Sequence, residues 1–291
     1  MDGPQPLVSP QGASYELRVV PAYAPLTWLV RGWDDFRASP LASGFYGAAF
    51  GVMGWALLAL YDFAYQYVST LAGAFLLAAP FLATGLYALS RDRERGGRPR
   101  FLASLTAWRR NIGGLGIYVL VITVIFLVWA RASLVTFALF STGTMPDLRD
   151  FLAKAFSLGN IEFVLVYFAA GGLFATLVFA VSVVSVPMLL DRDNDAVSAA
   201  IISVLVLAKN PGTMALWALI IVVLTGIGLA TAFVGLAVTM PVIGHATWHA
   251  YRDCVAWRTG PPLNRDSPYF HYFQSSRPSG SGTCSPKRKI A

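Results

Sequence analysis

"TMALWALIIVVLTGIGLATAFVGLAVTMPVIGHATWHAY" (Thr213–Tyr251) decides how many times this chain can cross a membrane, because the run is apolar almost without a break. One bilayer-spanning helix needs about 20 mostly apolar residues. The run is therefore long enough for two spans, and only "TGIG" (Thr225–Gly228) marks a turn within it. We predict two helices that meet at this glycine-containing segment.

The composition of the whole chain is that of a membrane protein. Of its 291 residues, 56% are hydrophobic and 13% are charged, whereas roughly 25% of the residues in an ordinary soluble domain are charged. Four more apolar stretches are long enough to span a bilayer, at about 41–60, 68–90, 112–130 and 162–190. The predicted fold class is therefore all-α, a polytopic membrane protein with six transmembrane helices.

The distribution of basic residues predicts the orientation of these helices. With six spans, 19 of the 22 Lys and Arg residues fall on one side of the membrane, and basic residues collect on the cytoplasmic side. A single helix over 213–251 would place the basic C-terminal tail on the opposite side. We therefore expect a protein of a bacterial inner (plasma) membrane with both termini in the cytoplasm.

A short repeat indicates that the spans come in tandem units. Each odd-numbered span follows an amphipathic segment that we expect to lie as a helix along the membrane interface. In the first of these, the apolar residues at helical spacing are Leu26, Leu29, Val30, Trp33 and Phe36. Each even-numbered span carries a proline and then closes in an Arg-Asp pair. The amphipathic segments are 26–40, 101–111 and 196–211; the prolines are Pro80, Pro187 and Pro241; and the pairs are Arg91-Asp92, Arg192-Asp193 and Arg252-Asp253. The alternative is that a motif as short as Arg-Asp recurs by chance.

The repeat predicts the domain organisation. A six-span membrane domain would cover 25–256, with a flexible cytoplasmic N-terminus over 1–24. Residues 259–291 are rich in Pro, Ser, Gly and basic side chains, which is typical of a disordered segment, so we expect a disordered basic cytoplasmic tail there. An outer interfacial helix is expected around Arg149–Phe156. The three units, each an interfacial helix followed by a transmembrane hairpin, would cover 25–95, 100–193 and 195–256.

Small residues recur within two of the spans. Gly47, Gly51 and Gly54 lie in the first span, and Gly171 and Ala175 lie in the fourth. Such spacing lets two transmembrane helices approach closely. We expect these residues to make helix contacts within one subunit; a dimerisation face is the alternative.

Four segments together resemble a known family. They are "GWDDFRASPLASGFYGAAFGVMGWAL" (32–57), "PFLATGLYALSRDRERG" (80–96), "PMLLDRD" (187–193) and "PVIGHATWHAYRD" (241–253). This pattern is similar to that of an uncharacterised bacterial integral membrane family, domain of unknown function 2189, over roughly 26–255. The resemblance implies a membrane topology, but no established activity and no functional residues.

Members of that family are sometimes labelled cytochrome c oxidase subunit I. A catalytic oxidase subunit needs more spans than the six predicted here, and more histidines than the three in this chain, to hold its haems and copper. We therefore exclude the catalytic oxidase function, and an accessory role in oxidase assembly rests on the label alone.

The candidate site is a histidine pair. His245 and His249 are four residues apart, so a helix places them on one face, where they could supply part of a zinc or copper site or bind a haem. Asp253, one turn further on, could orient His249. The simpler alternative is a polar interfacial cap with Trp248 and Tyr251 as belt residues, and a pH-sensing or lipid-headgroup role is a third. His245 and His249 are the metal-ligand candidates.

The remaining patterns limit the possible functions. No ionisable residue lies deep in a predicted span, which counts against a coupled pump, and no hydrolase or phosphate-binding motif is present, so we expect no enzyme. Arg91–Arg100, "RDRERGGRPR", is explained by its cytoplasmic position; we expect contact with anionic lipid headgroups at this loop and at the tail, and no nucleic acid.

Two kinds of function remain. We expect a permease-like protein or a scaffold for a membrane complex, without a cofactor. The alternative is an accessory factor of respiratory-complex (cytochrome oxidase) biogenesis that binds a transition metal or haem through His245 and His249.

Overall fold

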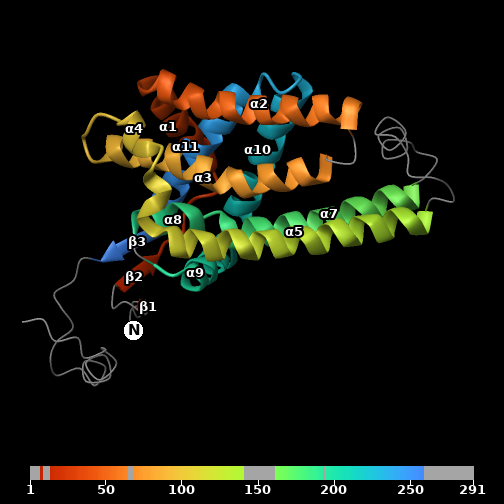
Figure 1. Ribbon diagram of the computed structural model, residues 1–291. Helices are drawn as coiled ribbons and strands as arrows, with labels where there is room; N and C mark the ends of the chain where they lie inside the picture. The colour runs from red at the N-terminus through yellow and green to blue at the C-terminus, as the bar shows by residue number, and fades with distance from the viewer. Residues whose placement is uncertain (1–6, 9–13, 65–67, 141–160, 193, 259–291) are drawn as a thin grey trace, which may run out of the picture.

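The computed structural model is mainly helical and describes residues 7–8, 14–64, 68–140, 161–192 and 194–258. In Figure 1, α2 (Pro40–Ala64), α3 (Val68–Glu94), α5 (Ile112–Phe140) and α7 (Ile161–Ser182) lie roughly parallel. The other elements of the helical part are α1 (Ala24–Ala38), α4 (Phe101–Ser104), the 3₁₀ helix η2 (Ala107–Asn111), α8 (Ser185–Asp191), α9 (Ala196–Lys209), α10 (Pro211–Ala230) and α11 (Leu236–Cys254).

Four helical stretches in the described part of the chain are long and apolar enough to cross a membrane. They are Pro40–Ala59, Phe101–Phe140, Ile161–Asp191 and Pro211–Ala230. α3 and α11 occupy the second and sixth predicted spans but are not among the four. The second half of α11 is polar, since it carries two histidines and an arginine. Six spans in three hairpins therefore remain a prediction.

The run over 213–251 forms two helices, but the turn lies later than predicted. Thr225–Gly228 are helical and belong to α10, and the turn covers 231–235. A side chain at Gly228 would meet Leu236 Cδ2 at 2.4 Å. The glycine that we took as a turn signal instead lets α11 pack closely against α10.

Other features define the actual turn. Ala232 and Phe233 adopt positive φ angles, which residues with a side chain rarely do. Trp55 of α2 donates a hydrogen bond of 2.5 Å from Nε1 to the Ala232 carbonyl oxygen. The Thr231 hydroxyl accepts a hydrogen bond from the Gly235 amide at 2.9 Å. The turn is thus fixed by polar contacts that the apolar pattern does not reveal.

α11 lies at the centre of the helix packing and contacts α1, α2, α3 and α10. Several of these contacts need glycine: a side chain at Gly32 of α1 would be 2.7 Å from the Ala246 backbone nitrogen, and one at Gly47 of α2 would be 2.0 Å from the Ala237 carbonyl oxygen. Gly54 faces the Phe233 ring in the same way. The prediction that the glycines of the first span make contacts within one subunit is confirmed for Gly47 and Gly54.

The segments expected at the membrane interface fold in different ways. α1 and α9 confirm the helices predicted over 26–40 and 196–211, whereas 101–111 forms only the short α4 and η2. On α1, the predicted apolar face is only partly covered by protein, because Leu26, Val30 and Trp33 are exposed whereas Leu29 and Phe36 are half-buried. The opposite face of α1, with Trp28 buried, packs against α11.

A small antiparallel sheet that the sequence did not predict joins the two ends of the described chain. β2 (Ser14–Leu17) pairs with β1 (Leu7–Val8) on one side and with β3 (Val255–Arg258) on the other. The sequence assigned residues 1–24 to a flexible terminus, but Ser14–Leu17 form this central strand and the next residues are held by Asn210. Its Oδ1 accepts a hydrogen bond from the Val20 amide at 2.8 Å.

The ends of α3, α8 and α11 meet on one side of the molecule. Arg95 Nη2 is 3.2 Å from Asp191 Oδ1, and Arg252 Nη1 is 3.7 Å from Asp191 Oδ2. We call this side of the molecule, around Arg95, Asp191 and Arg252, the Arg-Asp end. The expected outer helix around 149–156 and the basic tail over 259–291 lie outside the described residues.

Candidate functional site

His245 is fully buried and lies between two serines from neighbouring helices. Its Nε2 is 2.9 Å from Ser43 Oγ of α2, and its Nδ1 is 2.7 Å from Ser90 Oγ of α3. A neutral imidazole has one donor and one acceptor nitrogen, so both are satisfied here. A metal at His245 would have to displace one of the two serines.

His249 pairs with a different helix. Its Nε2 is 2.9 Å from Asp35 Oδ2 of α1, and the other oxygen of Asp35 accepts a hydrogen bond of 2.5 Å from Arg93 Nη1. Burial on its own raises the pKa of Asp35, but the hydrogen bonds with His249 and Ser90 and the electrostatic effect of His249 and His245 together outweigh it and hold this pKa below its usual value. Asp35 is therefore a buried carboxylate with three partners, His249, Arg93 and Ser90.

The expected pairing of His249 with Asp253 is wrong. Asp253 instead accepts a hydrogen bond of 2.8 Å from Trp28 Nε1 and forms an ion pair with Arg31, both on α1. α1 packs along α11, so Trp28 and Arg31 of α1 reach Asp253. This long-range contact was not visible in the local spacing.

The expected aromatic belt residues are also placed differently. Trp248 and Tyr251 are buried rather than exposed at a surface, with exposed fractions of 1% and 0%. Trp248 donates from Nε1 to Glu94 Oε2 at 2.9 Å, and the Tyr251 hydroxyl donates to Asp191 Oδ2 at 3.0 Å. They connect α11 to the ends of α3 and α8.

These contacts show what the Arg-Asp end can do chemically. Within the described residues, no group of three His, Cys, Asp or Glu side chains is placed to hold a metal ion. Burial raises the pKa of the Cys254 thiol to about 12, which keeps it protonated. His245 and His249 each bond to a different helix or helices, and apart from the Arg93–Asp35 pair, which joins α3 to α1, the contacts just described join α11 to another helix.

Asp35, Ser43 and Ser90 were missed by the sequence analysis. One signal for Asp35 was available, because Trp28, Gly32 and Asp35 are spaced i, i+4 and i+7 and therefore share a helix face. All three are buried, and this is the face of α1 that packs on α11. Ser43 and Ser90 carry no comparable pattern.

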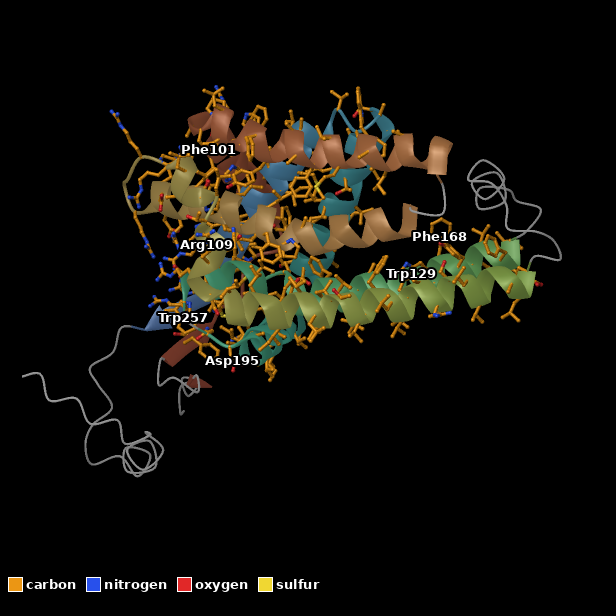
Figure 2. The ribbon with its side chains drawn as sticks, in the orientation of Figure 1. Phe101, Arg109, Trp129, Phe168, Asp195 and Trp257 are labelled. Atoms are coloured by element: carbon orange, nitrogen blue, oxygen red, sulfur yellow. The ribbon has the colours of Figure 1, made fainter. Side chains whose placement is uncertain are left out.

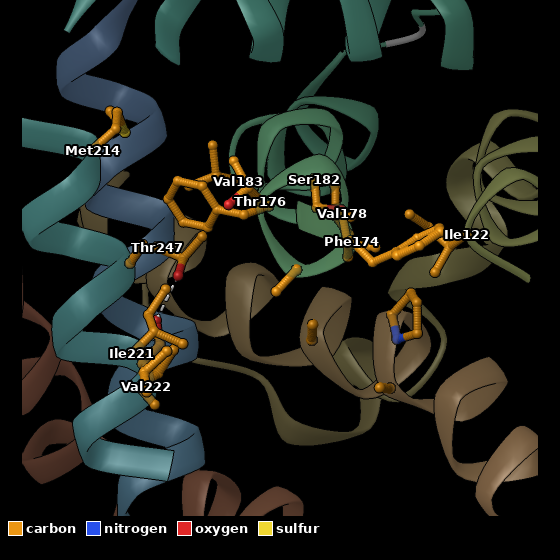
Figure 3. Close-up of a pocket in the computed structure, with 18 of the residues that line it drawn as sticks. Ile122, Phe174, Thr176, Val178, Ser182, Val183, Met214, Ile221, Val222 and Thr247 are labelled. Atoms are coloured by element: carbon orange, nitrogen blue, oxygen red, sulfur yellow. Dashed lines mark hydrogen bonds between the residues drawn. The ribbon is translucent and has the colours of Figure 1, made fainter. Parts of the chain in front are cut away.

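A second candidate site is a cavity of about 1170 Å³ between the helices (Figure 3). α3, α5, α7, α10 and α11 supply most of its wall, with one residue from α2. Among the described residues that line it, none is Asp, Glu, His, Lys or Arg. Residues typical of its wall are Ile122, Phe174, Val178, Met214, Ile221 and Val222.

Polar atoms in the cavity wall are few and mostly occupied. The Tyr118 hydroxyl donates to Ser182 Oγ at 2.6 Å, and Thr247 Oγ1 donates to the Ile243 carbonyl oxygen at 2.7 Å. Tyr87 also lines the cavity, and its hydroxyl has no hydrogen-bond partner in the part of the chain that the structure describes. Among the described residues, the wall thus offers the unpaired Tyr87 hydroxyl in largely apolar surroundings.

The described structure and the sequence can now be compared with known proteins. A family described as "Predicted integral membrane protein (DUF2189)" matches residues 67–191. This is the family that the sequence resembles. The family match covers α3 to α8 and leaves α1, α2 and α11, including both histidines of the candidate pair, outside it. No curated protein and no solved structure matches the chain.

The family match and the four apolar stretches both indicate a membrane protein. The family is named as integral to the membrane, and the described helices are long and apolar enough to cross one. The chain is therefore an integral membrane protein. The family carries no assigned activity. The features of the molecule that bear on its function are the cavity and the Arg-Asp end.

Proposed function

We propose that this chain is a non-enzymatic, permease-like protein of a bacterial inner membrane, which holds an uncharged, largely apolar molecule between its helices. The cavity is the observation that supports this proposal. Its volume of about 1170 Å³ is slightly above the range of roughly 300 to 1,000 Å³ that is usual for small-molecule sites.

The wall of the cavity favours an uncharged occupant. Moving a charged group from water into an apolar site without a partner costs several kcal/mol of free energy or more. Tyr87 provides the one unpaired hydroxyl found there, which suits a single hydroxyl, carbonyl or ether group on the bound molecule. A lipid-like molecule with a small polar group fits this chemistry.

The proposal extends to the topology. Six spans with both termini in the cytoplasm would put the Arg-Asp end at the cytoplasmic surface, in agreement with the distribution of basic residues. The cavity would then lie within the thickness of the bilayer, where a molecule can enter from the lipid. Cysteine accessibility labelling from either side of membrane vesicles tests this orientation.

Photo-crosslinking tests the binding site. An uncharged diacylglycerol analogue with a diazirine on one acyl chain is added to proteoliposomes, and the labelled peptides are identified by mass spectrometry. We expect labelling of α3, α7 and α10, and loss of most of it in Ala218→Trp, because Ala218 lines the cavity.

Leu219→Trp is the matched control. Leu219 is the next residue on α10 and is 58% exposed, so a tryptophan there leaves the cavity open. Equal labelling of wild type, Ala218→Trp and Leu219→Trp would contradict the cavity as a binding site. If a stable membrane complex also copurifies, the scaffold role becomes the better explanation.

A further inference from the structure

A second binding site is indicated by Arg91, at the end of α3. Its side chain is only 13% exposed, and its guanidinium donates from Nη1 to the Leu190 carbonyl oxygen at 3.3 Å. The nearest carboxylate contact is long, at 3.9 Å between Nη2 and Asp92 Oδ1. The Nε atom is buried and has no hydrogen-bond partner among the described residues. A buried, incompletely paired guanidinium is costly, so it calls for a further acceptor.

Positive charge is in excess around this residue. Residues 91–110 contain seven arginines but only two acidic residues, and Figure 2 shows nitrogen-bearing side chains gathered around the labelled Arg109. Glu94 is already bound by Arg252 and Trp248. Arg110 is exposed and has no ion-pair partner in the described part of the chain.

Arg95 and Arg110 lie near enough to Arg91 to act on it. Burial lowers the pKa of Arg91, and the positive charges of Arg95 and Arg110 lower it further, against the smaller opposing effects of Asp92 and Asp191. Arg91 is therefore repelled by the guanidinium groups of Arg110 on η2 and of Arg95, which also pairs with Asp191 at 3.2 Å. An anion between them would relieve this repulsion.

A second unpaired donor is buried at the same junction of α3, η2 and α8. Asn194 is buried, with 5% of the residue exposed, and its Nδ2 has no hydrogen-bond partner in the part of the chain that the structure describes. The backbone carbonyl of Asn194 accepts a hydrogen bond of 2.9 Å from Asn111 Nδ2, next to Arg110. Donors thus exceed acceptors here, which is the reverse of a cation site.

We infer that Arg91, Arg95 and Arg110 form a binding site for a phosphate group. Planar guanidinium groups match the oxygens of a phosphate, which can accept several charge-assisted hydrogen bonds at once. The phosphate can belong to the headgroup of an anionic phospholipid or to free phosphate in solution. The sequence predicts contact with anionic lipid headgroups at the basic loop, and the inferred site assigns a phosphate contact to three residues. This site is separate from the apolar cavity.

The test measures thermal unfolding of the full-length protein in an uncharged detergent. The protein is titrated at constant ionic strength with phosphatidylglycerol, with phosphatidylcholine, or with inorganic phosphate. We expect saturable stabilisation by phosphatidylglycerol and little by phosphatidylcholine if the source is a lipid. Saturable stabilisation by inorganic phosphate assigns the site to a soluble phosphate.

Arg110→Gln is the main variant, because Arg110 is exposed and its loss leaves the fold intact. We expect about tenfold weaker binding of whichever phosphate compound stabilises the wild type, as one charged hydrogen bond contributes roughly 1.5 kcal/mol or more. Arg37→Gln on α1 removes the same charge from another exposed position and serves as the control. Arg91→Gln is a second variant, informative where it folds.

Two results would overturn the inference. One is equal stabilisation by phosphatidylglycerol and phosphatidylcholine, with no effect of inorganic phosphate. The other is an equal loss of affinity in Arg110→Gln and Arg37→Gln, which would mean that only the net charge of the protein matters. Neither result bears on the apolar cavity, whose labelling is measured separately.

Discussion

Replacement of His245 by alanine tests whether this residue is structural. The substitution removes two interhelical hydrogen bonds, to Ser43 on α2 and to Ser90 on α3, at a residue with no solvent exposure. Interhelical hydrogen bonds in membrane proteins contribute about 0.6 to 1.7 kcal/mol each, so the pair accounts for about 1 to 3 kcal/mol. The cavity left by the imidazole adds to this loss.

The assay is reversible unfolding in mixed detergent micelles, followed by tryptophan fluorescence. We expect His245→Ala to lower the free energy of unfolding by at least about 2 kcal/mol, the sum of the hydrogen-bond and cavity losses. The triple variant Ser43→Ala, Ser90→Ala, His245→Leu removes all three polar groups and fills the space. It should recover part of the stability, since removing both partners of a buried hydrogen bond can be nearly neutral, although Ser90 also bonds Asp35 and Ser43 Oγ also lies 3.2 Å from Ser39 Oγ.

The outcome separates a structural histidine from a ligand-binding one. Unchanged stability in His245→Ala would refute the role argued from the two serine contacts. A triple variant as unstable as His245→Ala would show that the hydrogen bonds are not the source of the loss. A stable triple variant without cellular function would point to a role of the imidazole beyond packing.

Three further predictions concern other contacts. Gly47→Leu should strongly destabilise the protein in the same unfolding assay, because a Cβ there would be 2.0 Å from the Ala237 carbonyl oxygen. A Cβ at Gly44 meets nothing within 4 Å, so Gly44→Leu should be tolerated. The pKa of Asp35 is below its usual value of 3.8, so its carboxylate stabilises the fold above that pH and loses this effect as the pH falls through the lowered pKa. The difference in the free energy of unfolding between wild type and Asp35→Asn should therefore disappear on acidification. A constant difference would contradict the pairing with His249. Metal analysis and an absorption spectrum of gently purified protein should show no stoichiometric metal and no Soret band; either signal would favour the respiratory-biogenesis alternative.

The helices could be predicted from the sequence where local pattern determines them. The apolar stretches gave the positions of α2, α5 and α10, and the amphipathic pattern over 26–40 gave α1. The turn was misplaced because Gly228 has two possible roles: it can end a helix or allow another helix to approach. Only the position of Leu236 in space decides between them.

The site was predicted only in part, for a similar reason. The spacing of His245 and His249 placed both on one helix, but their partners lie on α1, α2 and α3, about 155 to 214 residues away in sequence. No local rule pairs Asp35 with His249. The cavity is harder still, because its volume depends on how five helices leave space between them.

The pairing of β2 with β3 has a consequence for biosynthesis. Ser14–Leu17 leave the ribosome early, but their partner Val255–Arg258 is among the last described segments to be made. At about 5 to 20 residues per second, the first strand must wait on the order of 10 to 50 s for the second. β2 is therefore made before the helices but is among the last elements to reach its final structure, and a ribosome that stalls before Val255 leaves the β2 edge unpaired.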